Sequence, residues 1–399
     1  MDLVSGQPYW LMKNGILHHY ASLTQDHRTD VLIIGGGITG AITAHYFTKA
    51  GLHCTVIEKR HIGMGSTCSS TSLIQYEIDT PLSELIKLKG ENASITAYRL
   101  SDEAVTEVLK LGKLLQDDSV QKKTSLYFSS SKKDVKHLRE EYIARKGMNL
   151  AVSWLNKEDL KHKFNLSADA AILSENAAML DAYSLTHKLL QHNIQKGLEV
   201  FALTEAVKIK YVKAGIHVKT QWGNVIKCNK LIYATGYESQ EMISKKIVNL
   251  NSTFAFITQP IETLPTHFIN TIFWETARPY LYFRSTNDKR LIIGGMDSKF
   301  KNAALRSLLM DKRAGQLKNK FQMLYPALRI IPDFTWAGTF GETKDGLPYI
   351  GTYKNIPHTY FACGFGGNGI TFSMIAAQLI RDQILQKQNP YAQLFSFNR

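Results

Sequence analysis

Three glycines near the start of the chain have a spacing that suits the binding of a dinucleotide. Gly35, Gly37 and Gly40 follow the apolar run 31–34 and lead into a helix-like stretch, 41–47. The first glycine permits a tight turn between strand and helix, the second lets the backbone approach a pyrophosphate, and the third lets the helix pack closely on the strand. The free N–H groups at the start of such a helix attract phosphate. The spacing therefore predicts a dinucleotide site, with a purely structural turn as the alternative.

An acidic residue stands where a ribose would lie. The stretch 52–57 predicts a second strand, and Glu58 follows it directly. A carboxylate in this place accepts hydrogen bonds from ribose hydroxyls, and its charge repels a 2′-phosphate. Two more segments suit a long polar cofactor, namely the loop 63–73, rich in small and hydroxyl side chains, and the glycine-rich turn 364–370 before the last helix. Because these segments lie far apart, we expect the binding domain to be assembled from distant parts of the chain.

The composition predicts a sizeable core and a basic surface. The 399 residues are 44% hydrophobic, which suits one large domain or two of ordinary size, and the net charge is +14. The lysines are scattered and no nucleic-acid motif accompanies them, so a solvated basic surface is favoured over a nucleic-acid partner. Contact with an anionic membrane surface stays open. No apolar run approaches the roughly 20 residues that span a bilayer.

Cysteine usage indicates a reducing compartment. Cys54, Cys68, Cys228 and Cys363 lie far apart and lack the spacing of metal ligands. The first 29 residues carry no signal-peptide pattern. We therefore expect a cytoplasmic protein without a metal site.

The predicted elements divide the chain into two kinds of segment, and the predicted fold class is α/β (α+β). Charged amphipathic helices fill 81–163, including one that Ser101 is expected to cap and that should end near Leu115, whereas aromatic-rich strands dominate 241–333. We predict a discontinuous Rossmann-like cofactor domain and a substrate domain built on an antiparallel β-sheet. The expected limits are 25–80, 164–240 and 334–399 for the cofactor domain, 81–163 and 241–333 for the substrate domain, and 1–24 for an N-terminal extension.

Together these segments resemble the D-amino-acid oxidase-like family of FAD-dependent oxidoreductases, in the branch of glycine, sarcosine and γ-glutamylputrescine oxidases. The resemblance extends from about Asp30 to Asp382. It rests on the order of several short motifs: the fingerprint 35–40, Glu58, Gly-Ser-Thr at 65–67, Ala-Thr-Gly at 234–236, Tyr-Phe-Arg at 282–284 before the paired glycines 294–295, Lys-Asp-Gly-Leu-Pro at 344–348, and the turn 364–370. The resemblance implies FAD, held without a covalent bond, because 336–343 lacks the cysteine that tethers the flavin in some relatives.

The resemblance also implies which residues would contact FAD, in three groups from its ADP end to its flavin. The ADP end would be held by Ile38, Thr39, Glu58 and Lys59, with the backbone of Val207 at the adenine. The pyrophosphate and flavin would be followed by Ser66, Thr67, Thr71, Ser72 and Leu73, with the backbone of Thr235 and Gly236 against the cofactor. The edge of the flavin ring would be surrounded by Gly364, Phe365, Gly366, Gly367, Asn368, Gly369, Ile370 and Thr371. The positive end of the last helix would then face the flavin and favour its reduction.

The substrate side departs from the family pattern. Relatives of the glycine oxidase type anchor a substrate carboxylate with one arginine just before an Asp-Gly-Pro turn and often with another in the last glycine loop, where Phe340 and Gly367 stand here. A buried carboxylate needs a charged partner, so a simple α-amino acid is disfavoured as the substrate. Tyr282 matches a substrate-side tyrosine of the relatives and is predicted to line the pocket. Arg284 is predicted either to contact the substrate or to form a structural ion pair.

By resemblance, the protein is an FAD-dependent amine or amino-acid oxidase or dehydrogenase. It would oxidise the C–N bond of an amine or amino-acid-like substrate by hydride transfer to flavin N5, with O₂ or another molecule as electron acceptor. Two alternatives stay open at this point. One is a flavin-dependent RNA-modifying or RNA-associated protein, and the other is a non-catalytic flavoprotein subunit of an electron-transfer complex.

Overall fold

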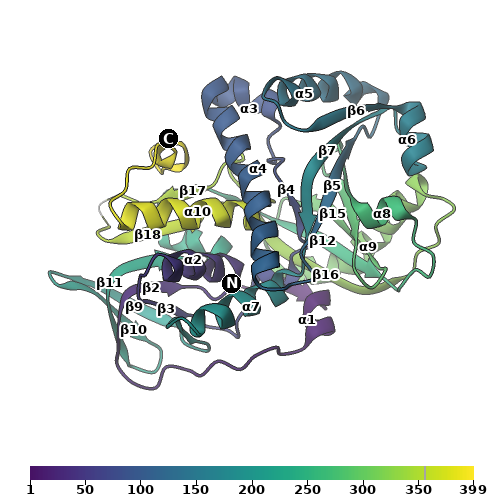
Figure 1. The fold of residues 1–399 in the computed structure, drawn as a ribbon. Helices are drawn as coiled ribbons and strands as arrows, with labels where there is room; N and C mark the ends of the chain where they lie inside the picture. Colours follow the sequence, from purple (N-terminus) through teal and green to yellow (C-terminus); the bar gives the residue numbers. More distant parts are fainter. Residues whose placement is uncertain (355) are drawn as a thin grey trace.

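A computed structural model describes residues 1–354 and 356–399, and the strands in this part of the chain form two sheets (Figure 1). The first, which we call the parallel-core sheet, has neighbouring strands that run parallel from β18 to β8. Its order is β17 (Tyr349–Gly351), β18 (Thr359–Cys363), β11 (Val225–Tyr233), β2 (His27–Ile34), β3 (Cys54–Ile57) and β8 (Glu199–Phe201), with β10 (Gly215–Thr220) on β11 and β9 (Ala206–Val212) on β10. Parallel strands require crossover connections, which are usually helical. The predicted α/β class with a Rossmann-like sheet is confirmed.

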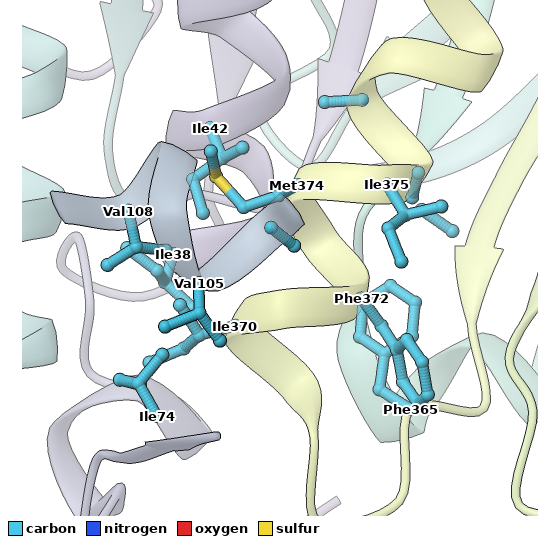
Figure 2. Packing of buried hydrophobic residues seen from close by; sticks show 14 of the residues in the cluster. Ile38, Ile42, Ile74, Val105, Val108, Phe365, Ile370, Phe372, Met374 and Ile375 are labelled. Atoms are coloured by element: carbon cyan, nitrogen blue, oxygen red, sulfur yellow. The ribbon is translucent and has the colours of Figure 1, made fainter. Parts of the chain in front are cut away.

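Helices with apolar faces cover the parallel-core sheet. They are α2 (Ile38–Lys49), α7 (Ala182–Ile194) and α10 (Gly369–Ile384), and α4 (Glu91–Leu114) packs against α10. Figure 2 shows Ile42 of α2 beside Met374 of α10, with Ile38, Ile370 and Val105 of α4 in the same cluster. Burial of each such side chain stabilises the fold by about 1.5–3 kcal/mol. This packing holds the starts of α2 and α10 together.

The second sheet, which we call the antiparallel sheet, is antiparallel except where β13 runs beside β5. Its order is β1 (Val4–Gly6), β16 (Pro332–Glu342), β12 (Asn249–Thr258), β15 (Leu291–Ser298), β14 (Leu281–Ser285), β13 (Thr271–Glu275), β5 (Gln121–Phe128), β7 (Ala170–Met179) and β4 (Leu73–Gln75), with β6 (Val152–Asn156) on β7. The long helix α9 (Ala303–Leu324) covers β12, β15 and β16 with Leu317 and Phe321. The other helices are α1 (Tyr9–Asn14), α3 (Leu82–Lys89), α5 (Val135–Gly147), α6 (Lys157–Phe164) and α8 (Thr266–Asn270). None of the described helices has the length and apolar character needed to cross a bilayer.

The helix predicted to begin at Ser101 begins at Glu91 instead. α4 runs without a break to Leu114, and Ser101 is buried in its middle. Gly90, with φ of +82°, separates α3 from α4. Ala97 and Tyr98 extend the buried face of the helix on the N-terminal side of Ser101. Packing of that face therefore outweighs the local preference of serine for a helix start.

The two sheets do not divide the chain at the predicted domain limits. β7 and β16 come largely from the segments 164–240 and 334–399, assigned to the cofactor domain, and both pair in the antiparallel sheet. β1, from the extension 1–24, pairs with β16. The two sheets thus share segments across the predicted domain limits, and the limits themselves stay a prediction.

Candidate active site

A cavity of about 670 Å³ collects segments that lie far apart in the sequence. Its walls come from both sheets, from the 3₁₀ turn η1 (Ser66–Ser69) and from the start of α10. Of the site residues predicted from the sequence, only Gly40 and Arg284 lie outside its lining. The lining includes Gly35, Gly37, Ile38, Thr39, Glu58, Lys59, Ser66, Thr67, Thr71, Ser72, Leu73, Val207, Thr235, Gly236, Tyr282, Phe340, Gly364, Phe365, Gly366, Gly367, Asn368, Gly369, Ile370 and Thr371. Its volume is typical of a site for a small molecule or cofactor.

The first glycine turn has the close backbone approaches that its spacing predicts. Gly35 has φ of +119°, and a Cβ there would collide with the carbonyl of Ala234, which directly follows the neighbouring strand β11. A Cβ on Gly40 would collide with the carbonyl of Gly35, so α2 can lie against β2 only without a side chain at this position. Gly40 thus acts through packing, outside the cavity. Gly37 caps the N-terminus of α2 and lines the cavity.

Two hydrogen bonds join the first glycine turn to the other segments of the site. The Ile38 N–H donates to Thr67 Oγ1 at 3.0 Å, which ties η1 to the start of α2. The hydroxyls of Thr39 on α2 and Ser373 on α10 are hydrogen-bonded at 2.8 Å. Both glycine turns therefore meet at one cavity, as the sequence predicted.

The carboxylate of Glu58 is held in a fixed orientation. The Gly36 N–H donates to its Oε2 and the Arg60 N–H donates to its Oε1, each at 2.8 Å. Lys59 lines the cavity, but its ammonium donates to Glu238 at 3.1 Å. Burial opposes ionisation of Glu238, yet hydrogen bonds from Arg60 and Lys59 lower its pKa to about 2.

The second glycine turn is fixed by groups from two other segments, the stretch that follows β4 and the turn that contains Tyr237. Asn368 Nδ2 donates to the carbonyl of Glu77 at 2.8 Å, and the Gly367 N–H donates to Asp79 Oδ2 at 2.8 Å. The hydroxyl of Tyr237 donates to the carbonyl of Gly366 at 3.0 Å. The N-terminus of α10, with the residues 369–371, lines the cavity.

These features fit an extended dinucleotide cofactor. The backbone of Gly35 and Gly37 lines the cavity, and an oriented carboxylate follows at the end of β3. The N-termini of α2 and α10 reach the same cavity, so one helix start is available for each half of the cofactor. The residues present therefore suit a group with two polar ends.

Five of the lining residues are Asp79, Trp274, Tyr282, Asp297 and Phe340. We call them the substrate end, because the sequence analysis predicts Tyr282 and Phe340 on the substrate side. The ring of Tyr282 covers Gly294, where a Cβ would collide with it. Phe340 is buried against the cavity. Burial raises the pKa of Tyr282 to about 12, so this phenol is neutral at physiological pH. The substrate end combines aromatic surface with two carboxylates.

Arg284 points away from this end. Its buried guanidinium donates to the backbone carbonyls of Thr71 at 2.7 Å, Leu180 at 2.9 Å and Ser285 at 2.9 Å. Burial lowers the pKa of Arg284 to about 9. The geometry favours a structural role, with carbonyl groups in place of the predicted ion pair, and it does not support the predicted substrate contact. Arg284 instead fixes the backbone of the loop that carries Thr71.

The sequence reasoning missed Asp79, Trp274, Arg278, Tyr280 and Asp297, all of which line the cavity. The sequence could have indicated Asp297, because this residue follows the paired glycines 294–295 near the end of a buried strand. Asp79 follows the hydroxyl-rich loop and β4. Arg278 lies in the loop between β13 and β14, where no motif marks it.

Comparison with known proteins identifies relatives over almost the whole chain. The family described as FAD dependent oxidoreductase matches residues 30–383. Glycine oxidase from Geobacillus kaustophilus is 24% identical, and the match covers 92% of this chain and 95% of that enzyme. Gamma-glutamylputrescine oxidoreductase from Escherichia coli is 20% identical over 91% of this chain and 85% of that protein.

The fold has close counterparts among solved structures. The crystal structure of glycine oxidase from Geobacillus kaustophilus matches with a TM-score of 0.78 and 19% identity, covering 94% of this chain and 99% of that one. The two alternative functions, an RNA-associated protein and a non-catalytic subunit, receive no support from these comparisons.

Proposed function

Because the chain belongs to the family of FAD-dependent oxidoreductases, we propose that it oxidises the C–N bond of a small amine or amino-acid-like substrate. The family match confirms the predicted enzyme class and the FAD cofactor. The substrate is our inference from the substrate end. Its carboxylates, Asp79 and Asp297, lie beside aromatic side chains, and Phe340 and Gly367 stand where relatives carry arginine. Carboxylates and aromatic faces attract an ammonium group, and this charge pattern carries the proposal.

The chain would hold FAD at both ends. Bound FAD supplies a two-electron acceptor for the hydride of the substrate. We propose that Glu58 binds the ribose of the adenosine half and that the N–H groups at the start of α2 face the pyrophosphate. The turn 364–370 and the N-terminus of α10 would face the flavin, where the helix dipole stabilises negative charge.

The substrate end would position the amine and exclude water. Trp274 and Phe340 supply apolar walls, and Tyr282 supplies a neutral hydroxyl. Holding the carbon that bears the nitrogen in one orientation turns an encounter into an intramolecular step, which contributes much of the rate in such reactions.

The test is anaerobic bleaching of the visible flavin bands by matched sets of compounds. Each set contains an alkylamine, the amino acid with the same side chain, and the corresponding alcohol. We expect the amine to reduce the flavin and to be preferred over the amino acid by roughly 10-fold or more, because an unpaired buried carboxylate costs about 1–3 kcal/mol. Bleaching by alcohols with no response to any amine would refute the proposal.

Replacing Glu58 should weaken FAD binding. In Glu58→Gln, the ribose loses a charged hydrogen-bond acceptor worth about 1.5–3 kcal/mol, so we expect FAD affinity to fall by about 10-fold or more. Titration of the apoprotein with FAD, followed by flavin fluorescence, measures the change. Glu205→Gln is the matched control, since Glu205 lines the same cavity but is exposed. Equal FAD affinities for the two variants would show that Glu58 does not contact the ribose.

Three further predictions, on the electron acceptor, on membrane contact and on cellular location, belong to the proposal. They are O₂ or another molecule as the electron acceptor, contact of the basic surface with an anionic membrane, and a cytoplasmic location. The cysteines are buried free thiols, as a reducing compartment allows. Release of hydrogen peroxide during turnover would identify O₂, and cosedimentation with anionic vesicles would identify membrane contact.

A further inference from the structure

One carboxylate oxygen of Asp297, Oδ1, is shielded from solvent at the substrate end and has no hydrogen-bond partner among the described residues. Asp297 lies near the end of β15 and lines the cavity. A shielded carboxylate oxygen that lacks a hydrogen-bond donor is costly, and the cost is relieved when a ligand supplies a donor or a positive charge. We therefore expect a cation or a hydrogen-bond donor of the substrate to bind at Asp297.

The groups that face Asp297 come from several elements. Carboxylates are contributed by Asp79 after β4 and by Glu342 of β16, and a guanidinium by Arg278 of the loop between β13 and β14. Tyr280 and Tyr282 also face it, from β14 and the residue before it, and burial raises the pKa of both phenols, so they add no charge at physiological pH. The hydroxyl of Thr253 of β12 donates a hydrogen bond to the carboxylate, so among the described residues only Oδ1 is left without a partner. Two carboxylates and one guanidinium thus surround the carboxylate of Asp297, so negatively charged groups outnumber positively charged ones.

The surroundings bring the titration of Asp297 close to neutral pH. Burial raises its pKa to about 7, the charges of Glu342 and Asp79 act in the same direction, and Thr253 and Arg278 act against it. A carboxyl group in this range exists in both protonation states under physiological conditions, which is a property of groups that exchange protons with a ligand.

We propose that Asp297 binds the ammonium group of the substrate and takes one proton from it, so that the amine is neutral when its C–N bond is oxidised. This inference rests on the proposed function. The step converts an ammonium and a carboxylate into an amine and a carboxylic acid, and no electrons move. The substrate class is an aliphatic primary or secondary amine that arrives protonated. Transfer is favoured in the cavity because burial disfavours the charged forms of both partners.

Binding of an alkyltrimethylammonium ion to the FAD-loaded protein tests the cation site without any proton transfer. The shift of the visible flavin bands reports binding. We expect affinity to rise as the pH passes upward through about 7, because Asp297 ionises there. In Asp297→Asn, affinity at pH 8 should fall about 10-fold or more and lose this pH dependence, because a charge-assisted contact is worth roughly 1.5–3 kcal/mol. Affinity that does not vary with pH in the unaltered protein would overturn the inference, whatever the behaviour of the variant.

The pH dependence of anaerobic flavin bleaching tests proton transfer. In the unaltered protein, bleaching by an amine should increase with a midpoint near pH 7. In Asp297→Asn, only the amine already neutral in solution can react, so the midpoint should move upward toward the pKa of the amine itself. An unchanged midpoint in the variant would overturn the proton-transfer role.

Glu342→Gln is the matched control. Glu342 faces Asp297 but does not line the cavity, and it accepts a hydrogen bond from Asn251 at 2.8 Å. Removing its negative charge should move the midpoint slightly to lower pH and leave cation binding at pH 8 in place. If no amine bleaches the flavin, the proposed function fails, while cation binding that depends on Asp297 would still support the ammonium site. If amines bleach the flavin but cation binding does not depend on Asp297, the inference fails alone.

Discussion

Replacing Gly40 with valine is expected to abolish stable binding of FAD. A Cβ at this position would collide with the backbone carbonyl of Gly35. Because the obstacle is a backbone atom, rotation of a neighbouring side chain cannot relieve the collision. α2 would have to move away from β2, which displaces the turn 35–37 and the helix N-terminus that should face the pyrophosphate. We expect FAD affinity to fall by at least about 100-fold, since both the turn and the helix start are lost as ligands.

The measurement is the ratio of flavin to protein absorbance after purification, followed by FAD titration of the apoprotein. Gly315→Ala is the control. Gly315 lies in α9 with open space where a Cβ would be, so alanine should leave FAD binding unchanged and stabilise the helix by up to about 1 kcal/mol. A Gly40→Val protein that retains the full complement of FAD would contradict the packing role assigned to this glycine.

Replacing Arg145 with methionine is expected to cause the largest loss of stability from a single side chain. Arg145 is fully buried on α5, and its guanidinium donates to Glu141 at 2.7 Å and to Glu77 at 3.2 Å. Burial opposes the charge of both carboxylates. Arg145 and the N–H groups of Leu82 and Ser83 hold the pKa of Glu141 below its usual value, whereas burial raises that of Glu77. Without Arg145 two buried carboxylates would lack a cation, at a cost of about 3–5 kcal/mol.

Urea-induced unfolding measures this cost. The exposed pair Lys110–Glu107, at 2.6 Å, provides the comparison, and Lys110→Ala should change the free energy of unfolding by less than about 0.5 kcal/mol. Adding Glu77→Gln and Glu141→Gln to Arg145→Met should recover part of the loss, because the unpaired charges are then removed. Equal stability of Arg145→Met and the unaltered protein would show that pairing with Arg145 does not stabilise the fold.

The effect should extend to the active site. Glu77 lines the cavity, and its carbonyl accepts the hydrogen bond that fixes Asn368 at the start of α10. Arg145→Met is therefore expected to weaken FAD binding as well as the fold. FAD titration of the apoprotein, at a urea concentration well below unfolding, would separate the two effects.

Local motifs predicted many of the residues that line the cavity, because their geometry is local. The turn at 35–40, Glu58 after its strand and the loop 63–73 need only a strand, a turn and a helix to acquire their roles. The helix beginning at Glu91 was missed for the converse reason. Its start depends on the long apolar face that α4 presents to its neighbours, and Ser101 resembles a cap only when that packing is ignored.

Arg284 shows why residue type alone does not assign a role. An arginine on a strand beside a predicted pocket residue has the chemistry to bind a substrate, and Tyr282, two residues earlier, does line the cavity. The guanidinium of Arg284 instead meets the carbonyls of Thr71, Leu180 and Ser285. Residues separated by a hundred or more positions supply two of these partners, and no sequence pattern places them.

The amino-acid sequence by itself indicated a dinucleotide site and the α/β architecture, because glycine spacing and strand and helix periodicity act over a few residues. FAD followed from the resemblance of the ordered motifs to FAD-dependent oxidoreductases. The tertiary structure decided which charges meet at the substrate end. Asp79, Arg278 and Asp297 come from three separate segments, and only the tertiary structure brings them to one cavity. Electrostatic interactions depend on distance in space and on burial, neither of which the order of residues specifies.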